Sequence, residues 1–282
     1  MQLVVETRAT LETALREAIS KNEFVLHFQP QVDEVGKLLG FEALVRWKHP
    51  VRGLVLPGEF MSVIEQTALI FPFGRWVLES ACAQLTAWAA NPRAAHLSLA
   101  INVSAREFKQ ANFVDHVVAA VRNSGANPCN LKLELTETVL LDDVEEAVVK
   151  MQALKKNGVR FSLDDFGIGY ASLSYLKRLP FSQLKIDQSF IQNLLTDPND
   201  TAIVKMVIEL AHSMNIEVIA EGVETKEQHD FLVQHGCRAY QGYLFSLPLA
   251  QHALDKLLSD TDVSGNLGNE ATVLDINPGW NR

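Results

Sequence analysis

Cysteines, paired histidines and long apolar runs are scarce in this 282-residue chain, and each absence narrows the class of protein. The three cysteines, Cys82, Cys129 and Cys237, lie far apart without CxxC spacing, so we expect reduced thiols and a cytoplasmic setting. The eight histidines include no HExxH pattern, which argues against a histidine metal site. No apolar run reaches about 18 residues, so we expect no membrane-spanning helix.

Positive charge is also in the minority. The formal net charge is −9 at pH 7, and no broad basic face is apparent, which argues against binding to a nucleic-acid polymer. A small anionic substrate stays compatible with this charge, because local cations or bound metals can hold a phosphate. The N-terminus lacks a basic region followed by an apolar stretch, so we expect no signal peptide.

The sequence does contain a series of short apolar runs that end in an acid or an amide. LSLAIN, LKLELTE, VRFSLDD and EVIAE carry Asn102, Glu134, Asp164 and Glu221 in that order. QLKID carries Lys185, and GFEALVRW holds Glu42. Because active sites of α/β barrels form where the carboxyl ends of several strands converge, this pattern indicates one polar site assembled from many strands.

Strand-like and helix-like segments alternate along the chain. The expected strands lie at 24–29, 40–47, 97–103, 131–135, 160–164, 183–186, 217–221 and 238–240. The expected helices lie at 7–22, 57–68, 73–90, 113–123, 142–156, 173–179, 200–214 and 226–235. The turn at 30–37 is too short for a crossover helix, so the first two strands should pair antiparallel.

Eight strands with interleaved helices predict the α/β class, as a TIM-like (β/α)8 barrel with its first strand antiparallel to the rest. We place the barrel within residues 1–258. Residues 259–282 are rich in Asp, Asn and Gly with little periodicity, so we expect a flexible tail there.

Side-chain alternation assigns the polar residues of these strands to one face. In LSLAIN, the large apolar residues share one face, and Ser98, Ala100 and Asn102 share the other. Lys132 and Glu134 alternate with leucines in the same way. We expect the apolar face to pack against the helices and the polar face to line the barrel interior.

Each candidate also has an ordinary structural interpretation. Asn102 and Asp164 fit helix caps or turns, Glu134 and Glu137 fit exposed acids at a helix start, and a lone Lys185 is usually a surface residue. Several carboxylates at one end of a barrel repel one another, however, unless cations bind among them. Ligands that are all oxygen atoms favour Mg²⁺ or Mn²⁺ over zinc.

Seven ordered motifs resemble those of the EAL domain family, the cyclic di-GMP phosphodiesterases. The triplet that names the family stands here as Glu42-Ala43-Leu44, within GFEALVRWKHP. The other six motifs are INVS, ELTE, DDFGIGYASL, LKIDQSF, AEGVET and QGYLFSLPL. The resemblance as a whole covers roughly residues 11–258.

The resemblance implies hydrolysis of cyclic di-GMP to linear 5′-pGpG with two divalent ions, Mg²⁺ or Mn²⁺. The implied ligands of one ion are Glu42, Asn102, Glu134, Asp164 and Glu221. Asp164 and Asp165 are the implied ligands of the other ion. The implied catalytic set adds Lys185 acting on the attacking water, Gln241 beside that water, Glu137 anchoring the loop of Asp165, and Glu224 supporting Lys185 or the ligands. The implied substrate contacts are Gln29, Leu44 and Arg46, with Arg46 on a phosphate.

The sequence departs from the family pattern at a few positions, none of which removes an implied ligand. Ile168 and Ala171 lie in the loop after Asp165, Ser62 replaces a common proline, and Leu247 stands where a cationic residue is usual. The resemblance also implies a homodimer and an association with GGDEF or sensory domains. Two alternatives stay open: a receptor that binds cyclic di-GMP without turnover, and an unrelated metal-dependent barrel hydrolase.

Overall fold

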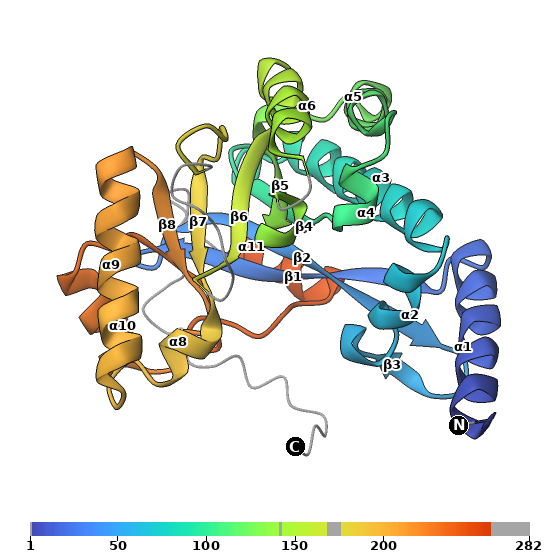
Figure 1. The fold of residues 1–282 in the computed structure, drawn as a ribbon, viewed down its shortest axis with the longest axis horizontal. Helices are drawn as coiled ribbons and strands as arrows, with labels where there is room; N and C mark the ends of the chain where they lie inside the picture. The colour runs from blue at the N-terminus through green and yellow to red at the C-terminus, as the bar shows by residue number, and fades with distance from the viewer. Residues whose placement is uncertain (1, 141–142, 168–175, 261–282) are drawn as a thin grey trace.

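The computed structural model describes residues 2–140, 143–167 and 176–260. Within these residues, nine strands form one sheet in the order β1-β9-β8-β7-β6-β5-β4-β2-β3, and pairing of β1 with β2 closes eight of them into a barrel (Figure 1). The barrel strands are β1 (Phe24–Asp33), β2 (Leu38–His49), β4 (Ser98–Asn102), β5 (Leu131–Thr136), β6 (Arg160–Phe166), β7 (Gln183–Ile186), β8 (Glu217–Ala220) and β9 (Ala239–Tyr240). The short β3 (Gly53–Val55) pairs with β2 outside the closed ring.

Strand direction matches the predicted barrel. β1 runs antiparallel to both of its neighbours, β2 and β9. The remaining barrel pairs, from β2 through β9, are parallel. The prediction of a TIM-like barrel with an antiparallel first strand is therefore confirmed.

The predicted turn at 30–37 begins too early, because β1 continues through Pro30 to Asp33. Pro30 lies opposite Phe41, and the register shifts between Gln31 and Val32, one residue beyond the proline. A strand accepts proline beside such an irregularity, since a missing amide costs least where the ladder is already interrupted. The extension matters because it brings Gln31 into the barrel wall.

Helices cover the outside of the barrel. Figure 1 shows α9 and α10 on one side and α3, α5 and α6 on the other. The helices are α1 (Gln2–Ser20), α2 (Met61–Gln66), α3 (Ile70–Ala89), α4 (Ala105–Phe108), α5 (Phe113–Ser124), α6 (Val144–Lys156), α8 (Gln188–Gln192), α9 (Pro198–Met214), α10 (Lys226–Gln234) and α11 (Gln251–Asp260). Short 3₁₀ turns cover Pro57–Glu59, Pro128–Asn130 and Glu137–Leu140. No helix in the described ranges has the length and apolar character needed to cross a bilayer.

Several helix predictions need correction. The expected helix at 57–68 is a 3₁₀ turn followed by α2, because Pro57 opens the segment and the chain turns again at Phe60. The helices α4, α8 and α11 were not predicted. α11 extends to Asp260, two residues into the expected tail, and the rest of that tail lies outside the described residues. Most of the expected helix at 173–179 also lies outside them.

Alternation along the strands separates two layers, as predicted. Leu133, Phe161 and Leu184 are completely buried in the apolar layer between strands and helices. The alternate positions contact one another across the interior, where Lys132 Nζ donates to Gln183 Oε1 at 2.8 Å. The barrel is therefore filled by polar as well as apolar side chains.

Candidate active site

Lys185 lies at the centre of an acidic cluster at the carboxyl end of the barrel strands. Its side chain is 1% exposed, and its Nζ lies 2.6 Å from Glu221 Oε1 and 2.7 Å from Glu134 Oε2. Asp164 Oδ1 lies 3.1 Å and Glu42 Oε2 3.6 Å from the same nitrogen. The acids come from β5, β6, β2 and the residue after β8, so the fold brings together four of the predicted metal ligands.

One ammonium faces four carboxylates in this cluster, and their pKa values reflect the imbalance. Burial raises the pKa of Glu134 well above its ordinary range despite attraction to Lys185, and it raises the pKa of Glu221 to about 8. Burial also opposes ionisation of Glu42, but Lys185 and hydrogen bonds from Gln241 and Asn102 bring its pKa below the usual value. The four acids outweigh the cost of burying Lys185 and raise its pKa. The cluster has more acid than one lysine can neutralise.

The donor atoms of the cluster fit a hard divalent cation. The ligand set contains carboxylate and amide oxygens, which Mg²⁺ and Mn²⁺ prefer. Among the described residues, Glu134 Oε1 is buried without a hydrogen-bond partner, which leaves a carboxylate oxygen available. No three acidic, histidine or cysteine groups in the described ranges already have the geometry of a metal site. The Lys185 ammonium lies among these carboxylates.

A chain of amides fixes the orientation of Glu42. Asn102 Nδ2 donates to Glu42 Oε1 at 2.8 Å, and Gln241 Nε2 donates to Glu42 Oε2 at 2.6 Å. Gln241 also donates to Gln29 Oε1 at 3.1 Å and accepts from Gln31 Nε2 at 3.0 Å. Sequence reasoning missed Gln31, although it shares a strand face with Gln29, because the strand was expected to end before it.

The segment after Asp164 has an unusual backbone. Asp165 has φ +54°, a left-handed value that Asp tolerates better than most residues, and its amide donates to Asp164 Oδ1 at 3.0 Å. Gly167 has φ +103°, and its amide donates to Glu137 Oε1 at 3.2 Å. Burial, reinforced by the charge of Asp164, raises the pKa of Asp165 to about 6. Ile168 and Ala171 lie outside the described residues.

A cavity of about 220 Å³ opens over the cluster. Its lining residues are Gln29, Glu42, Leu44, Asp164, Lys185, Gln188, Glu221, Gly222, Glu224, Gln241, Gly242 and Tyr243. The lining includes two of the three predicted substrate contacts. Arg46, the third, does not line it, and its guanidinium donates to Val45 O at 2.9 Å. Sequence reasoning missed Gln188 and Tyr243, which stand inside the quoted motifs but are neither acidic nor basic.

Comparison with known proteins decides the family. The chain matches the EAL domain over residues 12–248. It belongs to the EAL domain family. It is 43% identical over 241 residues to the bifunctional diguanylate cyclase/cyclic di-GMP phosphodiesterase MucR of Pseudomonas aeruginosa, covering 85% of this chain and 35% of that protein. It is 38% identical over 266 residues to the cyclic di-GMP phosphodiesterase NbdA of the same organism, covering 91% of this chain and 33% of that protein.

Solved structures agree with this assignment. The PaMucR phosphodiesterase in complex with c-di-GMP has a TM-score of 0.84 to this EAL domain at 42% identity, covering 87% of this chain and 99% of that one. The chain spans about a third of the length of the two curated relatives. The comparison therefore establishes the family and the fold, and it leaves the activity of this particular chain to be argued from its own residues.

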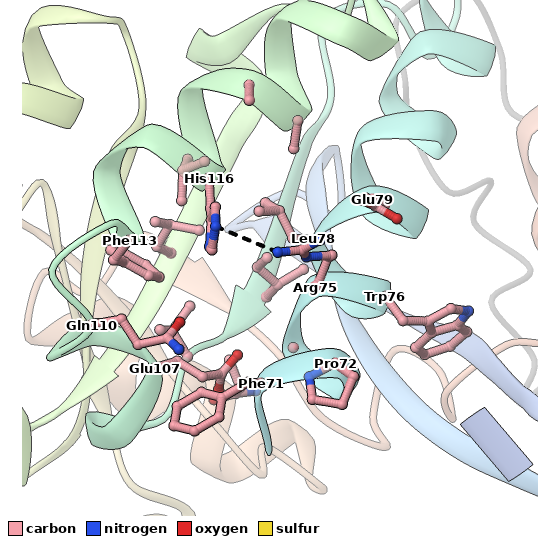
Figure 2. Close-up of a pocket in the computed structure, with 18 of the residues that line it drawn as sticks. Phe71, Pro72, Arg75, Trp76, Leu78, Glu79, Glu107, Gln110, Phe113 and His116 are labelled. Carbon is pink, nitrogen blue, oxygen red and sulfur yellow. Dashed lines mark hydrogen bonds between the residues drawn. The ribbon is translucent and has the colours of Figure 1, made fainter. Parts of the chain in front are cut away.

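This EAL domain also has a larger cavity, of about 900 Å³, away from the acidic cluster. Figure 2 shows Arg75 of α3 and His116 of α5 pointing toward one another across it, and their nitrogens are 3.4 Å apart. Phe71 and Phe113 contribute apolar surface, and the cavity reaches the predicted site residues only at Asn102. We place the chemistry in the smaller cavity, because the lysine and the acids converge there.

Proposed function

We propose that this EAL domain hydrolyses cyclic di-GMP to linear 5′-pGpG in the presence of two divalent ions, Mg²⁺ or Mn²⁺. The observation that carries the proposal is the convergence of four carboxylates from different strands on the buried Lys185. The two P. aeruginosa relatives, which are named as cyclic di-GMP phosphodiesterases, support the same activity.

The proposed ligands are those that the family resemblance implies, and the donor set described above is compatible with them. Glu42, Asn102, Glu134, Asp164 and Glu221 would hold one ion, and Asp164 with Asp165 would hold the other. The buried, unpartnered Glu134 Oε1 and the surplus of acid over cation both support this assignment. When bound, the divalent ions would activate water and neutralise charge on the phosphoryl oxygens.

The chain's own residues orient the reactants. The raised pKa of Lys185 keeps the side chain an ammonium, so its Nζ would hold the attacking water as a hydrogen-bond donor, and the Gln241 amide would lie beside that water while it fixes Glu42. Glu224, which lines the cavity, would support Lys185 or the ligands. As the water oxygen bonds to phosphorus, the water would pass a proton to a carboxylate of the cluster, the bond to the 3′ oxygen would break, and that oxygen would take up a proton from solvent, which leaves a 5′ phosphate on linear pGpG.

The substrate and the loop after β6 complete the proposal. Gln29 and Leu44 line the cavity and would contact the dinucleotide. Arg46 would bind a phosphate after its guanidinium leaves Val45 O, and arginine keeps its charge at neutral pH even though burial lowers its pKa. Glu137 would hold Asp165 in place through the Gly167 amide.

The cellular context is also a proposal. The much longer relatives support coupling to GGDEF or sensory domains, and the family resemblance supports a homodimer. The cysteines are all free thiols, with Cys82 and Cys237 buried, which supports a cytoplasmic location.

A metal-dependent assay with product identification tests the activity. Protein stripped with a chelator should be inactive, and added Mg²⁺ or Mn²⁺ should restore conversion of cyclic di-GMP to pGpG, identified by mass spectrometry. Glu42→Ala should abolish turnover, and normal turnover by this variant would refute the ligand assignment. Tight cyclic di-GMP binding with no turnover in any divalent metal would instead support the receptor alternative.

A further inference from the structure

The opposite, amino-terminal end of the barrel contains a second polar cavity, of about 770 Å³. It is lined in part by the first residues of the parallel strands, among them Ser98, Gln183 and Glu217. Its charged lining residues are the cations Lys37, Lys132, Arg160 and Arg238 and the acids Asp33 and Glu217. Cations therefore outnumber acids here, whereas acids outnumber cations at the carboxyl end.

Lys132 is the most deeply buried cation of this cavity. Lys132 is 3% exposed, and its Nζ donates to the neutral Gln183 Oε1 at 2.8 Å. Among the described residues, no carboxylate oxygen lies within 4.0 Å of Lys132 Nζ, which is the limit for an ion pair. Glu134 and Glu217 attract this ammonium only from beyond that distance, and a buried charge without a directly paired anion is costly, so the ammonium can still accept an anionic partner.

Arg160 adds a second cation directly beside the first. Arg160 and Lys132 are paired residues on the neighbouring parallel strands β6 and β5, so their side chains share one face of the sheet. Among the described residues, Arg160 Nε is buried and has no hydrogen-bond partner. Two adjacent like charges repel, and an orphaned buried N–H is expensive. Both costs fall if an anion binds between them.

The two acids of the cavity, Asp33 and Glu217, do not form ion pairs with Lys132 or Arg160. Asp33 Oδ1 already accepts hydrogen bonds from the Val35 and Lys37 amides, at 3.0 Å and 2.8 Å, within its own turn. Glu217, at the start of β8, is exposed and forms no ion pair with another described residue. The inner part of the cavity thus presents two cations, Lys132 and Arg160, without a directly paired anion.

We propose that this cavity binds a phosphate group carried by a free anion or by a small molecule of nucleotide size. The planar guanidinium offers paired N–H donors that match phosphate oxygens, and a lysine ammonium adds a point charge from a second direction. Lys37 and Arg238, exposed at the rim, add positive charge at the entrance. The volume lies within the range of small-molecule sites.

Calorimetric titration with inorganic phosphate tests the proposal, in phosphate-free buffer with EDTA. Without divalent ions, the acidic cluster repels phosphate and cannot turn substrate over, so the result is independent of the proposed hydrolysis. Lys132→Met and Arg160→Gln should each weaken the affinity by about tenfold or more, because each removes a charged hydrogen-bond donor. The matched control is Lys150→Met: Lys150 is also buried, but it lies on α6 outside this cavity and donates to Phe108 O.

The source of the phosphate is resolved by comparing adenosine monophosphate, adenosine and inorganic phosphate. Tighter binding of the nucleotide than of phosphate supports a nucleotide site, and equal binding supports a free-anion site. Adenosine binding as tightly as its monophosphate would overturn the proposal. Absence of phosphate binding, or unchanged affinity in both cavity variants, would overturn it as well. If Lys132→Met fails to fold, Arg160→Gln, whose side chain is only partly buried, still gives the decisive measurement.

Discussion

The two ends of this barrel are built from the same strands and carry opposite charge. On β5, Glu134 faces the carboxyl end and Lys132 the amino end; on β7, Lys185 and Gln183 take the corresponding positions. Lys185 has four carboxylates within ion-pair distance, whereas Lys132 has a neutral amide. Two buried lysines in one barrel interior thus have contrasting partners.

The contrast shows how a strand can serve two sites. Residues two positions apart share a face but lie about 6.6 Å apart along the strand, which separates the two layers of side chains. A surplus of acid in one layer calls for cations, and a surplus of cations in the other calls for an anion. The layer at the carboxyl end therefore favours binding of a cation, and the layer at the amino end favours binding of an anion.

Replacing each lysine by methionine should have opposite effects on stability, and this is the largest expected difference. Lys185→Met leaves four buried acids without their cation and should cost about 3–5 kcal/mol of unfolding free energy in EDTA. Lys132→Met removes a buried charge that lacks a counter-ion, so its stability should equal or exceed that of the parent chain. Denaturant unfolding of both variants measures the effect. A similar loss of stability in both variants would show that the two layers do not differ in charge balance.

The same lysine at the carboxyl end should also be needed for turnover. Lys185→Met should lower kcat/KM for cyclic di-GMP by about a hundredfold or more, because the attacking water loses the ammonium that positions it. Lys150→Met, a buried lysine outside both ends, serves as the control and should keep its activity. Parent-like kinetics of Lys185→Met at saturating Mg²⁺ would refute the role of Lys185.

Divalent ions should stabilise the acidic end. At a hundredfold excess over Kd, Mg²⁺ or Mn²⁺ should raise the unfolding free energy of the parent chain by about 2.7 kcal/mol. Glu134→Gln keeps the size of the side chain but removes a carboxylate, so it should lose most of this gain. Thermal unfolding with increasing metal concentration measures the effect without any substrate. Equal stabilisation of both proteins would place the ions elsewhere.

Glu107 provides a reference acid outside both ends, in the helical layer shown in Figure 2. Burial raises its pKa to about 7, although the Ser104 hydroxyl and amide donate to its carboxylate. Between pH 4.5 and 7 the folded chain holds a proton at Glu107 that the unfolded chain releases, so its contribution to stability falls as pH rises. Glu107→Gln should therefore be more stable than the parent at pH 7.5, by on the order of 2 kcal/mol, and similar to it near pH 5.

Denaturant titrations of the parent and Glu107→Gln at the two pH values measure this difference. Glutamine at this position can still accept from Ser104, so the cap of α4 is retained in the variant. A stability difference that does not change with pH would mean that Glu107 ionises normally. The raised pKa values of Glu134 and Glu221 at the carboxyl end would then be caused more by neighbouring charges than by burial.

The carboxyl end could be predicted from the sequence because its signals are local. Glu134 and Asp164 each end an alternating apolar run, and barrel topology brings strand ends together wherever the helices go. The TIM-like architecture followed from the same alternation. Short helices such as α4 and α8 could not be predicted, since four or five residues are too few to show a helical period.

The amino end could not be predicted as a site. Lys132 and Arg160 begin their strands, where a polar residue usually marks only the end of a loop, and their adjacency depends on the register of β5 against β6. Gln31 was missed because Pro30 and Gly36 indicated a turn, whereas pairing with β2 extends the strand through the proline. Tertiary pairing, which no short window contains, decided both cases.

Replacement of Gln31 has the smallest expected effect. It tests whether the two ends of the barrel act independently, because Gln31 contacts both of them. It lines the amino-terminal cavity, is 2% exposed, and donates to Gln241 Oε1 at 3.0 Å. Gln31→Met removes the donor that orients the Gln241 amide toward Glu42, so activity should fall by about tenfold with the fold retained. The control is Lys150→Met, since Lys150 is also a buried polar residue but donates to Phe108 O away from both ends. Full activity of Gln31→Met would mean that Gln29 alone orients Gln241, and the two ends would then be independent.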